Sequence, residues 1–343
     1  MLPEPLTWAF DARPPGEPRP PGPRVNPWAA AGALRVEPSP RERALLDGMW
    51  RADGVHRRAD GTATTIGRRP VPSAGAAYPV QTHLVVGAGE ALAPGRYVHD
   101  HESGLLRRRD PDADAAAGWD RPGRPREGTR LVLTVQPGRS FGRYRQRAWP
   151  LWIADAAYAL AAAEFLLAAP GLVVRLGPGA GLRSLLAVPR AGHAQRWLAR
   201  GLVPEIPLAA LDLPPSWTVD AERSRALRRR RSPPIAEFRA AGPGQDAAHA
   251  ERLAGASGQD WVRGAARLRS WSVSTTASAA ELATALWRAH RTAAAGCYAS
   301  ALSERWRCRP VSGFSAGADG CWTIHALACL PGPCPPGKET GAC

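Results

Sequence analysis

The sequence predicts an α+β protein built from two related halves, and three observations support this prediction. Short β-branched runs alternate with longer alanine-rich runs along most of the 343 residues. Residues 118–180 have the pattern of a strand, a polar insert, a long apolar helix and a β-run that enters a glycine turn, and residues 257–314 repeat this order. An arginine-rich break at Glu222–Phe238 separates the two. A duplicated α+β unit explains this order most simply.

The first half begins with an extended arm and a helix. Residues 1–40 are rich in proline, which predicts little regular structure there. Ser39–Asp53 has a plausible N-cap at Ser39 and apolar residues at helical spacing, so we expect a helix. Residues 82–88 predict a strand, and residues 94–110 predict a hairpin that turns at His101–Gly104.

A buried strand and the longest apolar segment follow. Residues 129–137 predict the strand, and Pro150–Gly171 predicts a helix that is apolar on almost every side and therefore central and buried. Residues 172–179 predict a strand that enters a glycine turn. In the second half, residues 257–314 predict a helix, a strand, a long helix and a strand that ends in a turn. The expected organisation is an arm (1–40), a first half (41–220), a degenerate second half (221–335) and a flexible tail (336–343).

Charge and composition narrow the classes of function. The formal net charge of +15 comes almost entirely from dispersed arginines, and no nucleic-acid-binding motif accompanies them, so we expect no nucleic-acid partner. No run reaches the length of a membrane span, and the N-terminus lacks the order of a signal peptide, so we expect a cytoplasmic protein. The six cysteines and eight histidines show no metal-ligand spacing, so we expect buried thiols and no metal.

The stretch RRPVPSAGAAYPVQTHLVV, at Arg68–Val86, is the best candidate for a binding loop. Its Ser-Ala-Gly-Ala core carries little side chain, so the backbone can approach a flat ligand closely. Ser73 and the backbone N–H groups can donate to ring heteroatoms, and the two arginines before them can reach a phosphate or a carbonyl. A simple turn that leads into a strand is the alternative interpretation.

This stretch resembles the R-x-x-P-S-A-G-A-x-Y-P segment of the nitroreductase superfamily, and in particular that of its azoline dehydrogenases of the streptolysin (SagB) and microcin (McbC) type. Further segments are similar to motifs of the same family, in the family's order, at 94–108, 142–171, 228–240 and 307–314. The resemblance implies an FMN-dependent, nitroreductase-like fold. It also implies oxidation of thiazolines and oxazolines to thiazoles and oxazoles in a ribosomally made peptide, as in thiopeptide biosynthesis.

The resemblance also implies site residues and partners. Arg68, Arg69, Ser73 and Gly75 are expected to lie against the isoalloxazine ring of FMN. The second motif is expected to supply phosphate and ring-edge contacts through Arg228, Arg230, Arg231 and Ser232. Family members form dimers that share flavin sites, so we expect a dimer or a pseudo-dimeric monomer with one composite site. The expected partners are a precursor peptide and a cyclodehydratase.

A Lys-Tyr pair of the family corresponds here to Arg143 and Tyr144, the expected catalytic residues. Arginine has a pKa above about 12 and cannot serve as a base at neutral pH. Tyr144 can do so only if the cations of Arg143, Arg145 and Arg147 lower its pKa. Otherwise the pair lines the site or packs.

Two other functions stay open at this stage. One is a generic flavin nitroreductase that takes electrons from NAD(P)H. The other is a flavin-free scaffold subunit of a peptide-modifying complex, which the substituted lysine and the incomplete motif of the second half favour.

Overall fold

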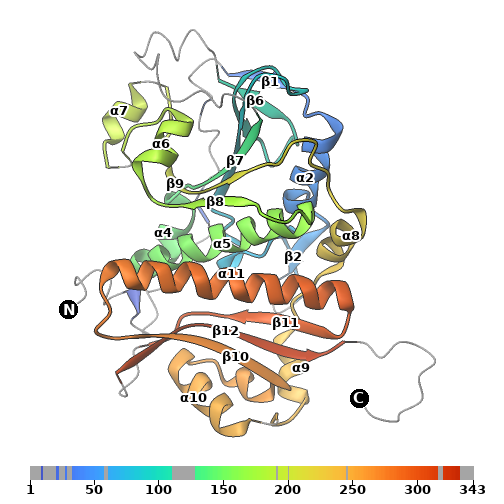
Figure 1. Cartoon of the computed structure of the whole chain (residues 1–343). Coiled ribbons are helices and arrows are strands. Elements are labelled where there is room, and N and C mark those ends of the chain that lie inside the picture. Colours follow the sequence, from blue (N-terminus) through green and yellow to red (C-terminus); the bar gives the residue numbers. More distant parts are fainter. Residues whose placement is uncertain are drawn as a thin grey trace. The chain divides into compact units, whose positions relative to one another are not determined.

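The chain forms two compact units in a computed structural model, which describes residues 9–10, 21–22, 28, 33–57, 61–109, 128–190, 192–199, 201–244, 246–315 and 320–332. The N-terminal unit is Gly16–Ser224. The C-terminal unit is Arg225–Cys343 together with Met1–Pro15. The predicted tail (336–343) and most of the predicted arm lie outside the described residues. Figure 1 shows both units, and each is described by itself.

A seven-stranded sheet organises the N-terminal unit, in the order β1-β6-β5-β4-β7-β9-β8. Every neighbouring pair in it is antiparallel. The inner strands β4 and β7 are almost completely buried, because both faces of the sheet are covered by helices. The strands are β1 (Leu34–Val36), β4 (Val80–Val86), β5 (Gly95–His99), β6 (Leu106–Arg108), β7 (Thr129–Val135), β8 (Val173–Leu176) and β9 (Ile206–Asp212).

Helix α5 (Ala148–Leu167) packs on one face of this sheet, against β4, β7 and β9 and against helix α2 (Pro40–Trp50). Its alanines lie flat on the strands, and most of its side chains are buried, as predicted. The segment Gly138–Leu167 is long and apolar enough to cross a membrane, but 67% of its most apolar window is buried inside the protein. The structure therefore uses it as the core helix of this unit.

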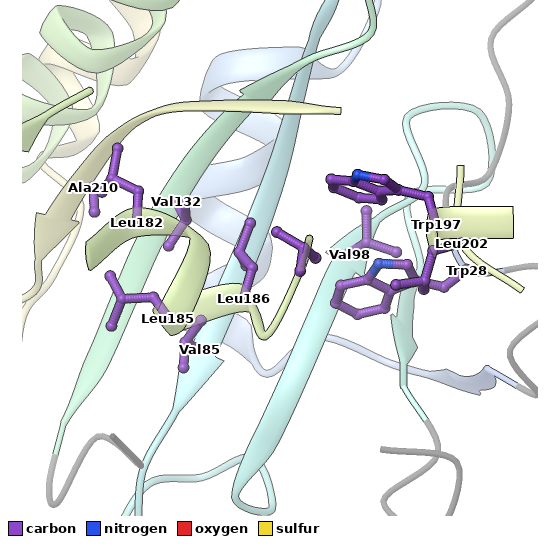
Figure 2. Packing of buried hydrophobic residues seen from close by; sticks show 11 residues of the cluster. Trp28, Val85, Val98, Val132, Leu182, Leu185, Leu186, Trp197, Leu202 and Ala210 are labelled. Atoms are coloured by element: carbon purple, nitrogen blue, oxygen red, sulfur yellow. The ribbon is translucent and has the colours of Figure 1, made fainter. Parts of the chain in front are cut away.

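The other face of the sheet is covered by α6 (Ala180–Leu186) and α7 (Ala194–Leu198). Figure 2 shows the leucines of α6 packed against side chains of the strands, with two tryptophans at one end of the cluster. Trp28, from the predicted arm, is one of these tryptophans and is 1% exposed. The cluster consists of Trp28, Val85, Val98, Val132, Leu182, Leu185, Leu186, Val188, Trp197, Leu202 and Ala210.

A three-stranded antiparallel sheet, in the order β10-β12-β11, forms the centre of the C-terminal unit. In Figure 1 the long helix α11 (Ala279–Ser303) lies along one face of these strands, while α9 and α10 lie on the other. A capping box of Ser278 and Glu281 fixes the start of α11. The other elements are α9 (Ile235–Ala240), α10 (Ala247–Ser257), the 3-10 turn η3 (Asp260–Gly264), β10 (Arg267–Ser274), β11 (Trp306–Val311) and β12 (Cys321–Pro331).

The α+β fold class predicted from the sequence is confirmed, and the differences concern short elements. The predicted helix at Ser39–Asp53 ends at Trp50, and the Ser39 hydroxyl bonds the Glu42 side chain instead of capping the backbone. The arm contributes strand β1, and a hairpin of β2 (Val55–Arg57) and β3 (Ala63–Gly67) precedes the candidate loop. These strands are too short for their hydrophobic period to be recognised. The related origin of the two halves stays a prediction.

Candidate functional site

The segment between β3 and β4 forms a strained turn around Gly75. It contains the 3-10 turn η1 (Ala74–Ala76), in which Gly75 has a φ of 54°. Two residues with side chains also adopt left-handed conformations, Ala76 (φ 55°) and Tyr78 (φ 46°). Such conformations cost on the order of 1–3 kcal/mol each and concentrate at functional sites, because the surrounding structure must enforce them. We call residues Pro70–Pro79 the SAGA loop.

Asp155 of α5 anchors the first residues of the SAGA loop. The Ser73 hydroxyl donates to one carboxylate oxygen (2.9 Å), and the Ala74 N–H donates to the other (3.0 Å). The Tyr78 N–H in turn donates to Ser73 Oγ (2.8 Å), so the two ends of the turn are tied to one hydroxyl. The sequence analysis missed Asp155 as a site residue.

Burial raises the pKa of Asp155 to about 7. Its side chain lies on the buried surface of α5 and is only 5% exposed, which disfavours the charged form. The hydrogen bonds from Ala74 and Ser73 act in the opposite direction but are weaker than the desolvation. The anchor of the SAGA loop therefore changes its charge close to neutral pH.

Arg143 and Tyr144 lie directly on Gly75. They are at the end of α4 (Gly138–Tyr144), which leads through the turn η2 (Arg145–Arg147) into α5. A Cβ atom added at Gly75 would overlap the Tyr144 hydroxyl and would lie 3.2 Å from Arg143 Cζ. The Arg143 guanidinium also lies 5.5 Å from the centre of the Tyr144 ring. The structure thus brings together four residues that the sequence predicted: Ser73, Gly75, Arg143 and Tyr144.

The condition for Tyr144 to act as a base is not met. Burial raises its pKa, and the nearby charge of Asp155 raises it further, whereas Arg143 and Arg147 lower it by less. The phenol therefore keeps its proton at neutral pH and can donate a hydrogen bond, but it cannot accept a proton from a substrate.

Two partly buried guanidinium groups also lie against the SAGA loop. Arg139 donates to the Ala77 carbonyl (2.7 Å), and Arg69 donates to the Trp50 carbonyl (3.1 Å) and lies over the Tyr78 ring. Burial lowers the pKa of both arginines, and the charge of Arg69 lowers that of Arg139 further. Within the described residues neither forms an ion pair, and the charge of Glu102 offsets the two cations only in part, so an excess of positive charge remains that suits an anionic group.

Arg68 and Arg69 point to different places. Arg68 Nε donates to the Asp53 carbonyl (3.0 Å) at the turn before β2, on the outside of the loop. Only Arg69, whose backbone N–H also donates to the Tyr78 hydroxyl (3.2 Å), faces the ring of Tyr78 in the loop.

The predicted second motif lies at the end of α8 (Ala221–Arg229) and just after it, in the C-terminal unit. Arg230 donates towards Ser232 Oγ (3.4 Å) and Cys297 Sγ (3.9 Å), and Arg231 donates to the Arg230 carbonyl (2.8 Å). The contribution of Arg228, Arg230, Arg231 and Ser232 to a flavin site therefore stays a prediction.

The residues of the N-terminal unit fit a flat anionic cofactor such as FMN. Gly75 lets the Tyr144 hydroxyl and the Arg143 guanidinium lie against the loop backbone, where a Cβ would exclude them. Arg69 and Arg139 supply positive charge that Glu102 offsets only in part. In the described part of the chain, no group of three or more His, Cys, Asp or Glu side chains could hold a metal ion.

Comparison with known proteins supports the fold. The sequence matches no family model, and it has no significant match among the curated proteins. Among solved structures, a protein of Anabaena variabilis described as a nitroreductase matches with a TM-score of 0.58 and 13% identity, over 92% of this chain and 94% of that one. The chain therefore has a nitroreductase-like fold, as the sequence resemblance implied.

A second solved structure, the E. coli microcin synthetase McbBCD complex, shares 18% identity over 50% of this chain and 60% of that chain. Its TM-score of 0.32 is too low to establish a common fold.

Proposed function

We propose that this protein is a flavin-dependent oxidoreductase that converts azolines in a ribosomally made peptide to azoles. The fold class is that of nitroreductases, and the substrate class comes from the resemblance of Arg68–Val86 and the later motifs to azoline dehydrogenases. The observation that carries the proposal is the SAGA loop. Its backbone at Gly75 is held in a left-handed conformation, and the two residues at the positions of the family's Lys-Tyr pair, Arg143 and Tyr144, lie on it.

The reaction removes two hydrogens from the azoline ring. One would leave a C–H bond as a proton that solvent base takes up, and the other would leave as a hydride. FMN, when bound, would supply the hydride acceptor, and oxygen would reoxidise it. In the proposed site, Ser73 and Gly75 contact the isoalloxazine ring of FMN, and Arg69 stabilises the negative charge of the reduced ring. Arg143 and Tyr144 orient the substrate, since neither can take up a proton at neutral pH.

Oxidation of a thiazoline-bearing peptide tests this proposal. After reconstitution with FMN, the protein is expected to convert the peptide in the presence of oxygen, with a mass loss of two hydrogens per ring. Arg143→Ala and Tyr144→Phe are expected to slow the reaction, and Arg145→Ala, which changes an exposed neighbour, serves as the matched control. Equal rates in the wild type and both variants would show that these residues have no role in the reaction.

One observation favours a second function, that of a flavin nitroreductase fed by a nicotinamide. Nitro-group reduction needs no base at the position of the family's lysine, and here an arginine occupies that position beside a protonated tyrosine. Rapid NADPH or NADH oxidation with a nitroaromatic acceptor, and no oxidation of the peptide, would favour this function.

The partners follow from the substrate. We propose a precursor peptide as the substrate and a cyclodehydratase as the supplier of azolines, both in the cytoplasm, because the azoline must be formed before it is oxidised. Co-purification of the protein with a peptide-cyclising enzyme from its source tests this proposal. If the protein binds no flavin at all, a scaffold role in such a complex takes its place.

A further inference from the structure

The hydroxyl of Ser73 in the SAGA loop is bonded to the titrating side chain of Asp155. It donates its single hydrogen to Asp155 Oδ2 (2.9 Å) and accepts one from the Tyr78 N–H (2.8 Å). The second carboxylate oxygen, Oδ1, accepts from the Ala74 N–H (3.0 Å). The two carboxylate oxygens of Asp155 thus hold the loop separately, one through the Ser73 hydroxyl and the other through the Ala74 N–H.

The hydrogen-bonding capacity of a hydroxyl gives this arrangement two states. A serine hydroxyl has one hydrogen and two lone pairs. With Asp155 ionised, the hydrogen of Ser73 is used by the carboxylate and one lone pair by Tyr78, so Ser73 can only accept a further hydrogen bond. With Asp155 protonated on Oδ2, the carboxyl donates to the second lone pair, and the hydrogen of Ser73 is free to be donated elsewhere.

We propose that the protonation state of Asp155 sets whether Ser73 donates or accepts the hydrogen bond that it offers to a bound ring. The inference rests on the proposed function, in which that ring is the isoalloxazine of FMN. The polar edge of oxidised isoalloxazine presents acceptors at N1, O2, O4 and N5 and a single donor at N3. A donating Ser73 therefore suits oxidised FMN better than an accepting one.

The surroundings of Asp155 allow this change near neutral pH. Burial raises its pKa to about 7, against the hydrogen bonds from Ala74 and Ser73. The titratable group that faces it is Tyr144 of α4, which keeps its own proton, and Arg143 and Arg147 act on that tyrosine. Within the described residues Asp155 forms no ion pair that would fix its charge. Because Oδ1 accepts from Ala74 in either state, the loop stays anchored when Asp155 takes up a proton.

Asp155 is thus a positioning residue, since it acts on the ring through Ser73. Two variants separate this role from simple support of the loop. In Asp155→Asn, the amide oxygen accepts from the Ala74 N–H and the amide NH₂ donates to Ser73, so this variant stays in the donating state at any pH. In Ser73→Ala, the hydroxyl is absent and Asp155 loses one hydrogen bond.

The first measurement needs no flavin. Carbon-13 NMR of protein labelled at the aspartate carboxyl carbons follows Asp155 from about pH 5.5 to about pH 8.5, and Asp155→Asn identifies its signal. We expect a midpoint near 7 that moves upwards in Ser73→Ala, because that variant removes a hydrogen bond that favours the carboxylate. An Asp155 that does not titrate in this range, or a midpoint that Ser73→Ala leaves unchanged, would overturn the proposal.

The second measurement is the affinity for oxidised FMN at the two ends of this range. One hydrogen bond between neutral groups predicts that the wild type binds about fivefold more tightly at the lower pH. Asp155→Asn is expected to keep the tighter affinity at both pH values, and Ser73→Ala the weaker. If Asp155 titrates but the wild type binds FMN with equal affinity at both pH values, the proposal that Asp155 controls the hydrogen bonding of Ser73 is overturned. If the wild type binds no FMN at either pH, the proposed function itself is contradicted. The flavin-free titration then still shows whether Asp155 and Ser73 are coupled, so the two failures can be told apart.

Discussion

The SAGA loop in the N-terminal unit and a group of buried thiols and imidazoles in the C-terminal unit are both rich in titratable residues, yet they differ in charge. In the C-terminal unit, Cys308 and Cys329 face each other across β11 and β12, and Cys297 of α11 lies beside them. The His290 and His325 rings are 4.2 Å apart. Burial lowers the pKa of His290 to about 3, lowers that of His325 and raises that of Cys297, so these three groups are neutral at pH 7. A hydrogen bond with Cys329 lowers the pKa of Cys308.

The SAGA loop, in contrast, is surrounded by charges that are not balanced. Asp155 titrates near neutrality. Arg69 and Arg139 are partly buried and form no ion pair among the described residues, and the charge of Glu102 offsets theirs only in part. Its backbone is also held at positive φ at Ala76 and Tyr78. Buried neutral groups are typical of packing, whereas strain and unbalanced charge must be maintained for a reason. The comparison supports the proposal that the loop, rather than the thiol group, is the functional site.

The largest expected effect comes from Gly75→Val. A β-branched residue at a φ of 54° is strained, and its Cβ would overlap the Tyr144 hydroxyl, so the loop or the tyrosine must move. We expect azoline oxidation to fall on the order of a hundredfold, as for a displacement of about 1 Å in a reaction site. Gly142→Ala is the matched control, because a Cβ there meets nothing within 4 Å. Wild-type rates in Gly75→Val would show that the loop is not at the reaction centre.

Asp155 should make the stability of the protein depend on pH. Folded Asp155 keeps its proton up to about pH 7, whereas in the unfolded chain it loses it near its usual value of 3.8. Between these values unfolding releases a proton, so the free energy of unfolding of the wild type falls with rising pH relative to Asp155→Asn. The difference reaches at most about 4 kcal/mol and levels off above pH 7. Urea unfolding of both proteins from about pH 4.5 to about pH 8 measures it. A difference that is constant with pH would mean that Asp155 is ionised in the folded protein.

Arg139→Met is expected to have a smaller effect. The variant leaves the Ala77 carbonyl without its charged donor, which costs about 1–3 kcal/mol of stability, and it removes one of the two cations that favour an anion at the loop. Unfolding and FMN titration measure the two losses. Arg145→Met, at an exposed position in the same segment, should stay within about 0.5 kcal/mol of the wild type. Similar results for the two variants would remove the charge argument for the loop.

The smallest effect is expected in the thiol group. Cys329→Ala removes a buried sulfur and should destabilise the C-terminal unit by about 1 kcal/mol. Because Cys329 is not one of the proposed site residues, we expect no change in the rate of peptide oxidation. A rate that falls as steeply as in Gly75→Val would show that the comparison assigns the function to the wrong unit.

The sequence could predict the elements whose signal is local. The alanine-rich helix α5, the hairpin of β5 and β6 and the glycine-centred loop were all recognised from a continuous stretch of residues. The partners of the loop were not, because Ser73 and Asp155 are 82 positions apart and meet only when α5 packs on the sheet. One signal was present: Asp155 is an acidic residue within an almost wholly apolar helix, and such a carboxylate needs a buried polar partner.

The charges that surround the SAGA loop could not be predicted from the sequence either. The pattern could show that Arg68 and Arg69 precede the loop, but neighbouring residues of an extended segment point to opposite sides, and only the structure shows which one faces it. Likewise, three arginines around Tyr144 suggested a lowered pKa, whereas its burial reverses the direction. Desolvation depends on the tertiary fold and has no counterpart in residue spacing.

The central claim is that the SAGA loop of the N-terminal unit binds a flavin. Purified protein saturated with FMN and freed of excess by gel filtration tests it most directly, with visible absorbance giving the flavin bound per chain. We predict about one FMN per wild-type chain and much less for Gly75→Val, with Gly142→Ala equal to the wild type. Wild-type protein that retains no FMN, or a Gly75→Val variant that retains as much as the wild type, would contradict the account.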